Sequence, residues 1–151
     1  MLRGDDRALP DRAAQGLRMA GWTPRRRVDV DEWESALAPE GFAMHAPARA
    51  FLTEFGGLVV PVSGPGRDSA RLGVRLDPLL CLGQKVWFDS LSGPTAGQLY
   101  PLGEEHDGHA SVAMDADGTI QLLFNDQIKR IGPGRNGLAR LLEGEEAPAG
   151  Q

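Results

Sequence analysis

The chain has 151 residues, of which 41% are hydrophobic and 25% are charged, and this composition predicts one soluble globular domain with its own core. Its formal net charge of −5 argues against a nucleic-acid-binding protein, because such proteins carry a surplus of cations that neutralise phosphates. An acidic surface favours solubility and would suit a basic partner.

Cysteine content and hydrophobic runs indicate the compartment. The single cysteine, Cys81, cannot form an internal disulfide and lies in an apolar run, which predicts a buried, inert thiol in a reducing environment. No apolar run approaches the roughly 20 residues needed to span a bilayer. Residues 1–8 are too charged for a signal peptide. We therefore expect a cytoplasmic protein that does not associate with membranes.

Two helices are predicted before residue 40. Apolar residues at helical spacing predict a short helix over residues 8–20. A second apolar stripe predicts an amphipathic helix over residues 30–38, for which Asp29 or Asp31 is the expected N-cap.

A helix followed directly by a strand is predicted over residues 51–61. Apolar residues over 51–55 have helical spacing, and the Gly56-Gly57 pair ends the helix because glycine adopts the left-handed conformation without a Cβ penalty. Residues 58–60 are a short apolar run that predicts a buried strand. This stretch is the corner around which we expect the fold to be built.

The middle of the chain predicts a second strand and a further helix. Residues 72–76 alternate between apolar and other residues, which predicts a strand antiparallel to the first. Asp77-Pro78 has the character of an N-cap followed by a first helical position. The helix that follows is expected to bury Leu80, Trp87 and Leu91.

The second half is predicted to be mainly β-structure. Residues 99–103 are expected to form an edge strand, because they contain a proline, and residues 104–109 a polar loop. Residues 112–124 predict a hairpin around an Asp-Gly turn. Ile128 and Ile131 are expected to cover one end of the sheet.

A last helix around residues 138–142 completes the predicted elements. Residues 1–8 and 145–151 are expected to be flexible tails. The order of elements predicts one α+β domain over residues 9–144, with a mostly antiparallel sheet and helices around it.

Possible metal ligands gather in one predicted loop, where His106 and His109 stand among Glu104, Glu105 and Asp107. Zinc requires three or four ligands held by a rigid frame, and here all the candidates lie on one loop. A solvated acidic loop is the favoured interpretation. A metal-binding protein or an enzyme built on the two histidines is the less favoured alternative.

Other chemical motifs give no site. Asp115-Ala116-Asp117-Gly118 has the spacing of the start of a calcium loop, but Thr119 and Asp126 stand where further ligands are required, so a hairpin turn is predicted. The chain has no Gly-x-Ser-x-Gly elbow and no phosphate-binding glycine loop. We predict no enzyme activity, no catalytic residues, no cofactor and no bound metal.

The predicted corner also resembles a known family. Phe51-Leu52 followed by Phe55-Gly56-Gly57-Leu58 is similar to the FLxxFGGL signature of the SUKH superfamily. Residues 20–29 resemble the aGWxpxRxvd opening of its third subgroup. Three later segments resemble LyPvG, iDxxG and LLxG, namely residues 99–103, 115–118 and 141–144. These similarities follow the family's order and cover residues 20–144.

The resemblance implies an immunity protein of a bacterial polymorphic toxin system, which binds and neutralises a cognate toxin without catalysis. The acidic charge fits a basic toxin such as a nuclease, since complementary charge speeds encounter. The residues expected to bind the partner are Glu104, Glu105 and Asp107, then Asp115 and Asp117, and finally Trp22 and Arg26 of the family opening. An intracellular adaptor that binds a cellular protein is the alternative role, because one fold can serve both.

Overall fold

Six strands form one antiparallel sheet in which each strand pairs with the next along the chain, in the order β1-β2-β3-β4-β5-β6. The computed structural model describes residues 9–92 and 98–145. Its helices and strands are α1 Asp11–Met19, α2 Asp31–Leu37, η2 Ala38–Glu40, α3 Ala46–Phe55, β1 Val59–Val60, β2 Val74–Arg75, η3 Pro78–Cys81, α4 Lys85–Ser92, β3 Tyr100–Glu105, β4 Ser111–Met114, β5 Thr119–Phe124, β6 Gln127–Pro133 and α5 Gly134–Glu143. The predicted α+β class with an antiparallel sheet is confirmed.

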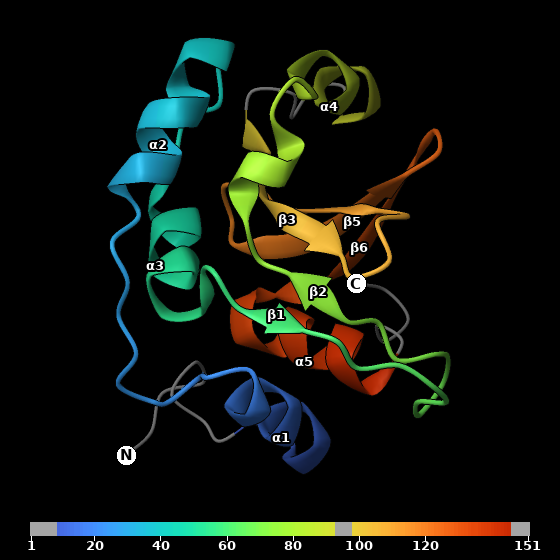
Figure 1. Cartoon of the computed structure of the whole chain (residues 1–151). Coiled ribbons are helices and arrows are strands. Elements are labelled where there is room, and N and C mark those ends of the chain that lie inside the picture. The colour runs from blue at the N-terminus through green and yellow to red at the C-terminus, as the bar shows by residue number, and fades with distance from the viewer. Residues whose placement is uncertain (1–8, 93–97, 146–151) are drawn as a thin grey trace.

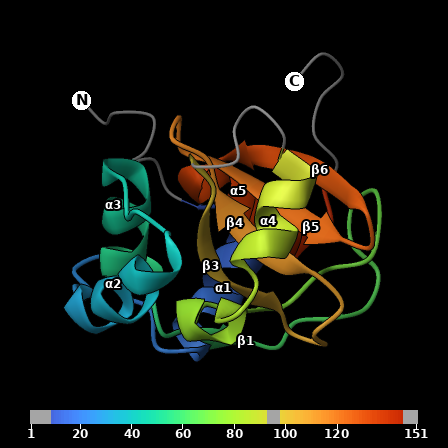
Figure 2. The same ribbon diagram turned by 90° about the horizontal axis from the view of Figure 1, so that it is seen from above.

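Helices cover the sheet on both sides. Helix α5 packs on β5 and β6, and α1 packs on α5 and β1. On the opposite side, η3 packs on β3 and α4 lies near β6 (Figure 1). Helices α2 and α3 stand beside the sheet, as the view from above shows (Figure 2). The apolar core therefore lies in two layers, one on each face of the sheet.

Aromatic side chains fill the layer between the sheet and η2, η3 and α4. Phe42, Phe88 and Tyr100 are all buried, and the ring of Phe42 lies 5.2 Å from that of Phe88 and 6.3 Å from that of Tyr100, in edge-to-face arrangements. Such arrangements match the quadrupoles of the rings. Burial raises the pKa of Tyr100 to about 12.

The two glycines of the predicted corner have different roles. Helix α3 ends at Phe55, and β1 begins at Val59. Gly57 has a φ of +85°, in the left-handed region expected of a residue that reverses the chain. Gly56 has an ordinary φ of −59°, but a Cβ there would lie 2.5 Å from the ring of Trp33 and 2.5 Å from the backbone oxygen of Leu52. Close packing by these two groups is thus the reason for the first glycine, and backbone conformation is the reason for the second.

The prediction that residues 99–103 form an edge strand is wrong. Strand β3 lies inside the sheet, between β2 and β4. It tolerates Pro101 because β2 pairs only with Glu104 and Glu105, so the proline needs no partner on that side. Glu104 and Glu105 belong to β3, and the polar loop is correspondingly shorter than predicted.

Strand β6 was not predicted. Ile128 and Ile131 lie in a strand that pairs along the whole of β5, and they do not merely cover the end of the sheet. The reversal before this strand uses Asn125, whose φ of +52° places it in the left-handed region that asparagine tolerates. The mixed polar pattern of β6 reflects its position at the sheet edge, where few side chains are buried.

The helix predicted after Asp77 is divided in two. Asp77 caps η3 as expected, with its carboxylate accepting a hydrogen bond of 3.0 Å from the backbone of Leu79. Gly83, with a φ of +83°, separates η3 from α4. The predicted buried face is wrong, because the buried residues are Pro78, Cys81 and Phe88, whereas Leu80, Trp87 and Leu91 are half-buried.

Other predicted boundaries hold with small shifts. The helix predicted over residues 30–38 is α2 followed by η2, and its N-cap is Val30, with Asp29 accepting a hydrogen bond from the backbone of Asp31. Of the predicted tails, 1–8 and 145–151, all residues except Glu145 lie outside the described residues, and Glu145 donates its backbone N–H to the carbonyl of Arg140.

A buried carboxylate joins the two helices α1 and α5. The Glu143 side chain, on α5, accepts a hydrogen bond of 3.2 Å from the backbone of Ala13 and lies 3.3 Å from the guanidinium of Arg67. Ala13 is in the first turn of α1, whose N-cap Pro10 provides no side-chain acceptor. The carboxylate therefore caps α1 from a helix far along the chain.

We predict that Glu143→Ala lowers the free energy of unfolding by about 2 kcal/mol, because a buried helix cap and an ion pair with the exposed Arg67 are lost together. Glu143→Gln should lower it less, since the amide oxygen still accepts from Ala13. Urea denaturation measures both. Glu145→Ala is the matched control, because its half-exposed carboxylate lies 4.0 Å from Arg67. Equal effects at the two positions would contradict the capping role.

Candidate partner-binding surface

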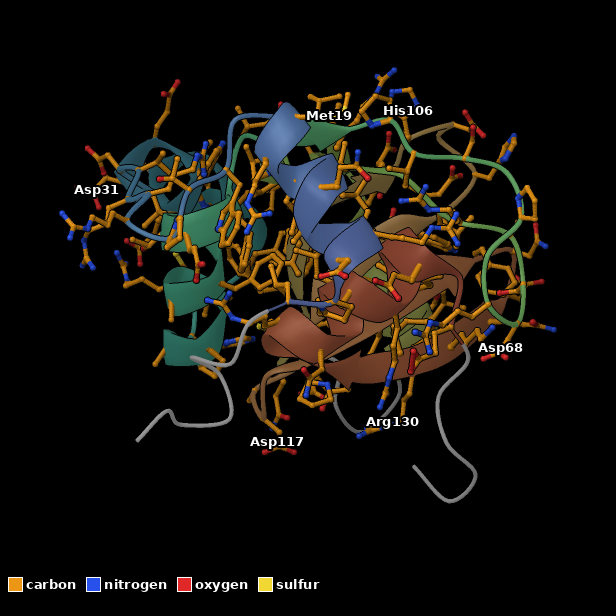
Figure 3. All side chains as sticks on the ribbon, turned by 90° about the horizontal axis from the view of Figure 1, so that it is seen from below. Met19, Asp31, Asp68, His106, Asp117 and Arg130 are labelled. Atoms are coloured by element: carbon orange, nitrogen blue, oxygen red, sulfur yellow. The ribbon has the colours of Figure 1, made fainter. Side chains whose placement is uncertain are left out.

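The acidic residues predicted to bind a partner lie at opposite ends of one strand. Glu104, Glu105 and Asp107 belong to β3 and the turn before β4, whereas Asp115 and Asp117 belong to the turn after β4. Figure 3 shows the separation, with His106 of the first turn and Asp117 of the second on opposite sides of the molecule. The structure therefore offers two separate acidic turns and does not join them into one patch.

In the first turn, one carboxylate maintains the turn and another faces solvent. Glu105 is 5% exposed, and its carboxylate accepts hydrogen bonds from the backbone of Asp107 at 2.8 Å and of His109 at 3.1 Å. The side chain of Asp107 is 72% exposed. Glu104 is half-buried on the strand. Asp107 is thus the acid of this group that is most available to a partner.

The second turn repeats this arrangement. Asp115 is buried, and its carboxylate accepts hydrogen bonds from the backbone of Asp117 at 2.9 Å and of Thr119 at 3.0 Å. It also accepts from the side-chain amide of Gln121 at 2.8 Å. Asp117, two residues on, is exposed. In both turns the buried acid binds the backbone two and four residues later.

Trp22 and Arg26 meet at Glu54 of α3. Trp22 is buried, and its indole N–H donates to the Glu54 carboxylate at 3.0 Å. Arg26 donates to the backbone carbonyl of Glu54 at 2.8 Å, and partial burial lowers the pKa of its guanidinium. Arg135 of α5 completes the group with two hydrogen bonds to the same carboxylate, at 2.8 and 2.9 Å. The polar groups of Trp22 and Arg26, in the segment that resembles the family's opening motif, are therefore hydrogen-bonded within the fold.

A groove of about 560 Å³ lies between the β3–β4 turn and the β5–β6 turn. Apolar side chains and polar side chains both line it, namely Leu72, Ala110, Leu122 and Phe124, and Glu105, Asp107, His109, Asn125 and Lys129. The two acids of this groove were predicted from the sequence as partner-binding residues, whereas its apolar residues and Lys129 were not. The alternation of Leu122 and Phe124 within the predicted hairpin was the available signal that they share one face.

The histidine pair does not converge on one point. Ligand atoms of Glu105, Asp107 and His109 lie within 4.8 Å of one another, and His106 does not belong to this group. The Nδ1 atom of His106 lies 3.8 Å from the Asp107 carboxylate. The group that forms is thus different from the predicted pair, and it comes from one turn in which two of its three members are exposed.

A second cavity, of about 420 Å³, lies at the other end of the sheet, beside the β4–β5 turn. Its lining includes Arg27, Phe51, Glu54, Gly118 and Arg135. The Arg135 and Glu54 side chains in its wall are already paired with each other. This cavity is therefore bounded by the group that joins α3 to α5.

Cys81 is enclosed in the core, as predicted. It is fully buried, and its thiol donates to the carbonyl of Gly103 at 3.4 Å. Burial raises the pKa of the Cys81 thiol to about 12. The nucleophilic thiolate is consequently rare at neutral pH.

Among the described helices, none is both long enough and apolar enough to cross a membrane.

Comparison with known proteins finds a match to one family model. The model of a family described as SUKH-3 immunity protein matches residues 9–144. The match extends from before α1 to the end of α5, and so includes every described helix and strand. No curated protein and no solved structure matches the chain.

We predict that Glu54→Ala lowers the free energy of unfolding by about 2 kcal/mol, because it leaves a largely shielded arginine without its partner. The Glu54 and Arg135 side chains are 23% and 18% exposed. Glu34→Ala is the matched control, since Glu34 pairs with Arg49 nearer the surface, where the side chains are 40% and 43% exposed. Thermal and urea denaturation should show a much smaller change for the control, and the reverse order would contradict the structural importance of Glu54.

We also predict that Cys81 resists labelling by a disulfide reagent at pH 8, because its raised pKa leaves almost no thiolate in the folded protein. Labelling should require unfolding and should rise with urea concentration in parallel with the loss of structure. Rapid labelling of the folded protein, at the rate of a free thiol, would show that the side chain is accessible and ionised.

Proposed function

Because the chain belongs to the SUKH-3 immunity protein family, we propose that it binds a cognate bacterial toxin and neutralises it by covering a surface of that toxin, without catalysis. The observation that carries this proposal is that the family match spans the whole described fold. The expected place of action is the cytoplasm, and neither nucleic acid nor membrane is an expected partner.

The charge of the protein supports a basic toxin, such as a nuclease. The net charge is −5, and both acidic turns present an exposed aspartate, Asp107 in one and Asp117 in the other. Complementary charge raises the rate of association and excludes partners of like charge. A toxin that binds nucleic acid would itself carry the cations that these turns attract.

The buried acids support a role in binding rather than in catalysis. Glu105 and Asp115 accept hydrogen bonds from the backbone of their own turns, which holds each turn in one conformation. A surface whose loops are already ordered loses less entropy when it binds. The exposed aspartates are therefore displayed on rigid supports, as a preformed binding surface requires.

The test is co-expression with the toxin encoded nearest to the gene. The protein should protect cells from that toxin and should co-purify with it, and the association rate should fall as salt increases. Failure to bind or protect, against every toxin of the same genome, would contradict the immunity role. Capture of a cellular protein in place of a toxin would favour the adaptor role.

We predict that Asp107→Lys weakens toxin binding about tenfold, mainly through slower association, because it reverses a charge at the interface. The melting temperature should not change, since the side chain is exposed. Glu32→Lys on α2 is the matched control, because it reverses an exposed acid away from both turns. Surface plasmon resonance gives both rates. A larger effect from Asp117→Lys would place the interface at the β4–β5 turn.

A further inference from the structure

The groove between the β3–β4 turn and the β5–β6 turn has an apolar floor. Leu122 and Phe124 are two residues apart on β5, so their side chains share one face of the sheet, and Leu72 lies beside them from the segment before β2. Leu122 is 5% exposed, whereas Leu72 and Phe124 are half-buried. Part of this apolar surface is thus open to whatever enters the groove.

One wall of the groove carries two converging carboxylates. Oxygen atoms of Glu105 and Asp107 and a ring nitrogen of His109 lie within 4.8 Å of one another. The backbone N–H groups of Asp107 and His109 fix the Glu105 carboxylate, yet each carboxylate oxygen can accept more than one hydrogen bond. The wall therefore offers acceptors for a cation at a fixed position.

A positively charged residue also lines the groove. Lys129 of β6 is among the lining residues, and it pairs with Leu122 of the apolar floor in the sheet. A cation that enters is attracted to the carboxylates and repelled by the lysine ammonium. The groove thus combines two carboxylates, an apolar floor and one lysine.

We propose that this groove receives an arginine side chain of the protein partner, with its guanidinium at Glu105 and Asp107 and its aliphatic stem on the apolar floor. This proposal rests on the proposed function and names the chemistry of the contact. Arginine fits better than lysine, because its planar fork can bind two carboxylates and can stack on the ring of Phe124. The pairing of a charged head with an apolar stem matches the two surfaces of the groove.

The first experiment uses a probe that does not require the toxin. N-acetyl-arginine amide is titrated into the isotope-labelled protein, and backbone amide shifts are recorded by NMR. N-acetyl-citrulline amide, an uncharged isostere, is the control ligand. We expect saturable shifts at Asp107, His109, Phe124 and Lys129 with the arginine compound, and much weaker shifts with citrulline.

Matched variants locate the site. Asp107→Asn should weaken binding of the arginine compound about fivefold, the upper range for loss of one exposed charge pair. Asp117→Asn, which removes the corresponding acid of the other turn, should leave the affinity unchanged. Equal weakening by both variants, equal binding of citrulline, or no saturable shift would overturn the proposal. So would saturable binding of zinc at the same amides with no response to arginine, since the group would then be a metal site.

The second experiment separates this proposal from the immunity role. Once the cognate toxin has been identified and the complex purified, the affinities of the Phe124→Leu and Asp107→Asn variants for the toxin are measured. Each should lower the affinity several-fold, with Asp117→Asn again as the control. If the variants bind the toxin with unchanged affinity, the proposed arginine site is refuted but the immunity role is not. If no toxin binds the wild-type protein, the immunity role is refuted, and the arginine titration still tests whether the groove binds arginine.

Discussion

The arrangement of the fold depends on one carboxylate, that of Glu54. It accepts hydrogen bonds from Trp22 and Arg135, and the backbone carbonyl of the same residue accepts from Arg26. The segment before α2, the end of α3 and the start of α5 therefore meet at one residue. The Arg135 guanidinium lies 5.5 Å from the centre of the Phe55 ring, so the polar group rests on the aromatic core. Both side chains are mostly shielded, so the loss of one would leave the other charge without its partner, and the three segments are held together by this pairing.

The acidic residues of the molecule divide into those that hold structure and those that face solvent. Glu105, Asp115 and Glu143 are buried and accept hydrogen bonds from backbone N–H groups, two of them within their own turns and one across two helices. Asp107 and Asp117 are exposed. A buried carboxylate without partners would be strongly unfavourable, so its hydrogen bonds identify its structural role. The net charge alone does not separate the two kinds, although the exposed acids are the more accessible to a partner.

Local signals explain how much of this architecture could be predicted. The corner at Gly56-Gly57, the hairpin at Asp115 and the end of α5 at Gly144 each depend on a few consecutive residues whose conformational preferences are strong. Strand β6 was missed because it lies at the sheet edge and its exposed residues lack clear alternation. Pro101 led to the wrong prediction that β3 is an edge strand. Whether a strand inside a sheet tolerates a proline depends on how far the neighbouring strand extends, and β2 pairs only with Glu104 and Glu105.

The sequence by itself determined the class of fold, the family and the acidic character, since these follow from composition, from local patterns and from motifs in a fixed order. Only the tertiary structure decided which acids are displayed and what lies beside them. Leu72, Phe124 and Lys129 join Asp107 at one groove although they come from different parts of the chain. Strand pairing brings them together, and pairing between distant segments depends on the whole sheet rather than on any local run of residues.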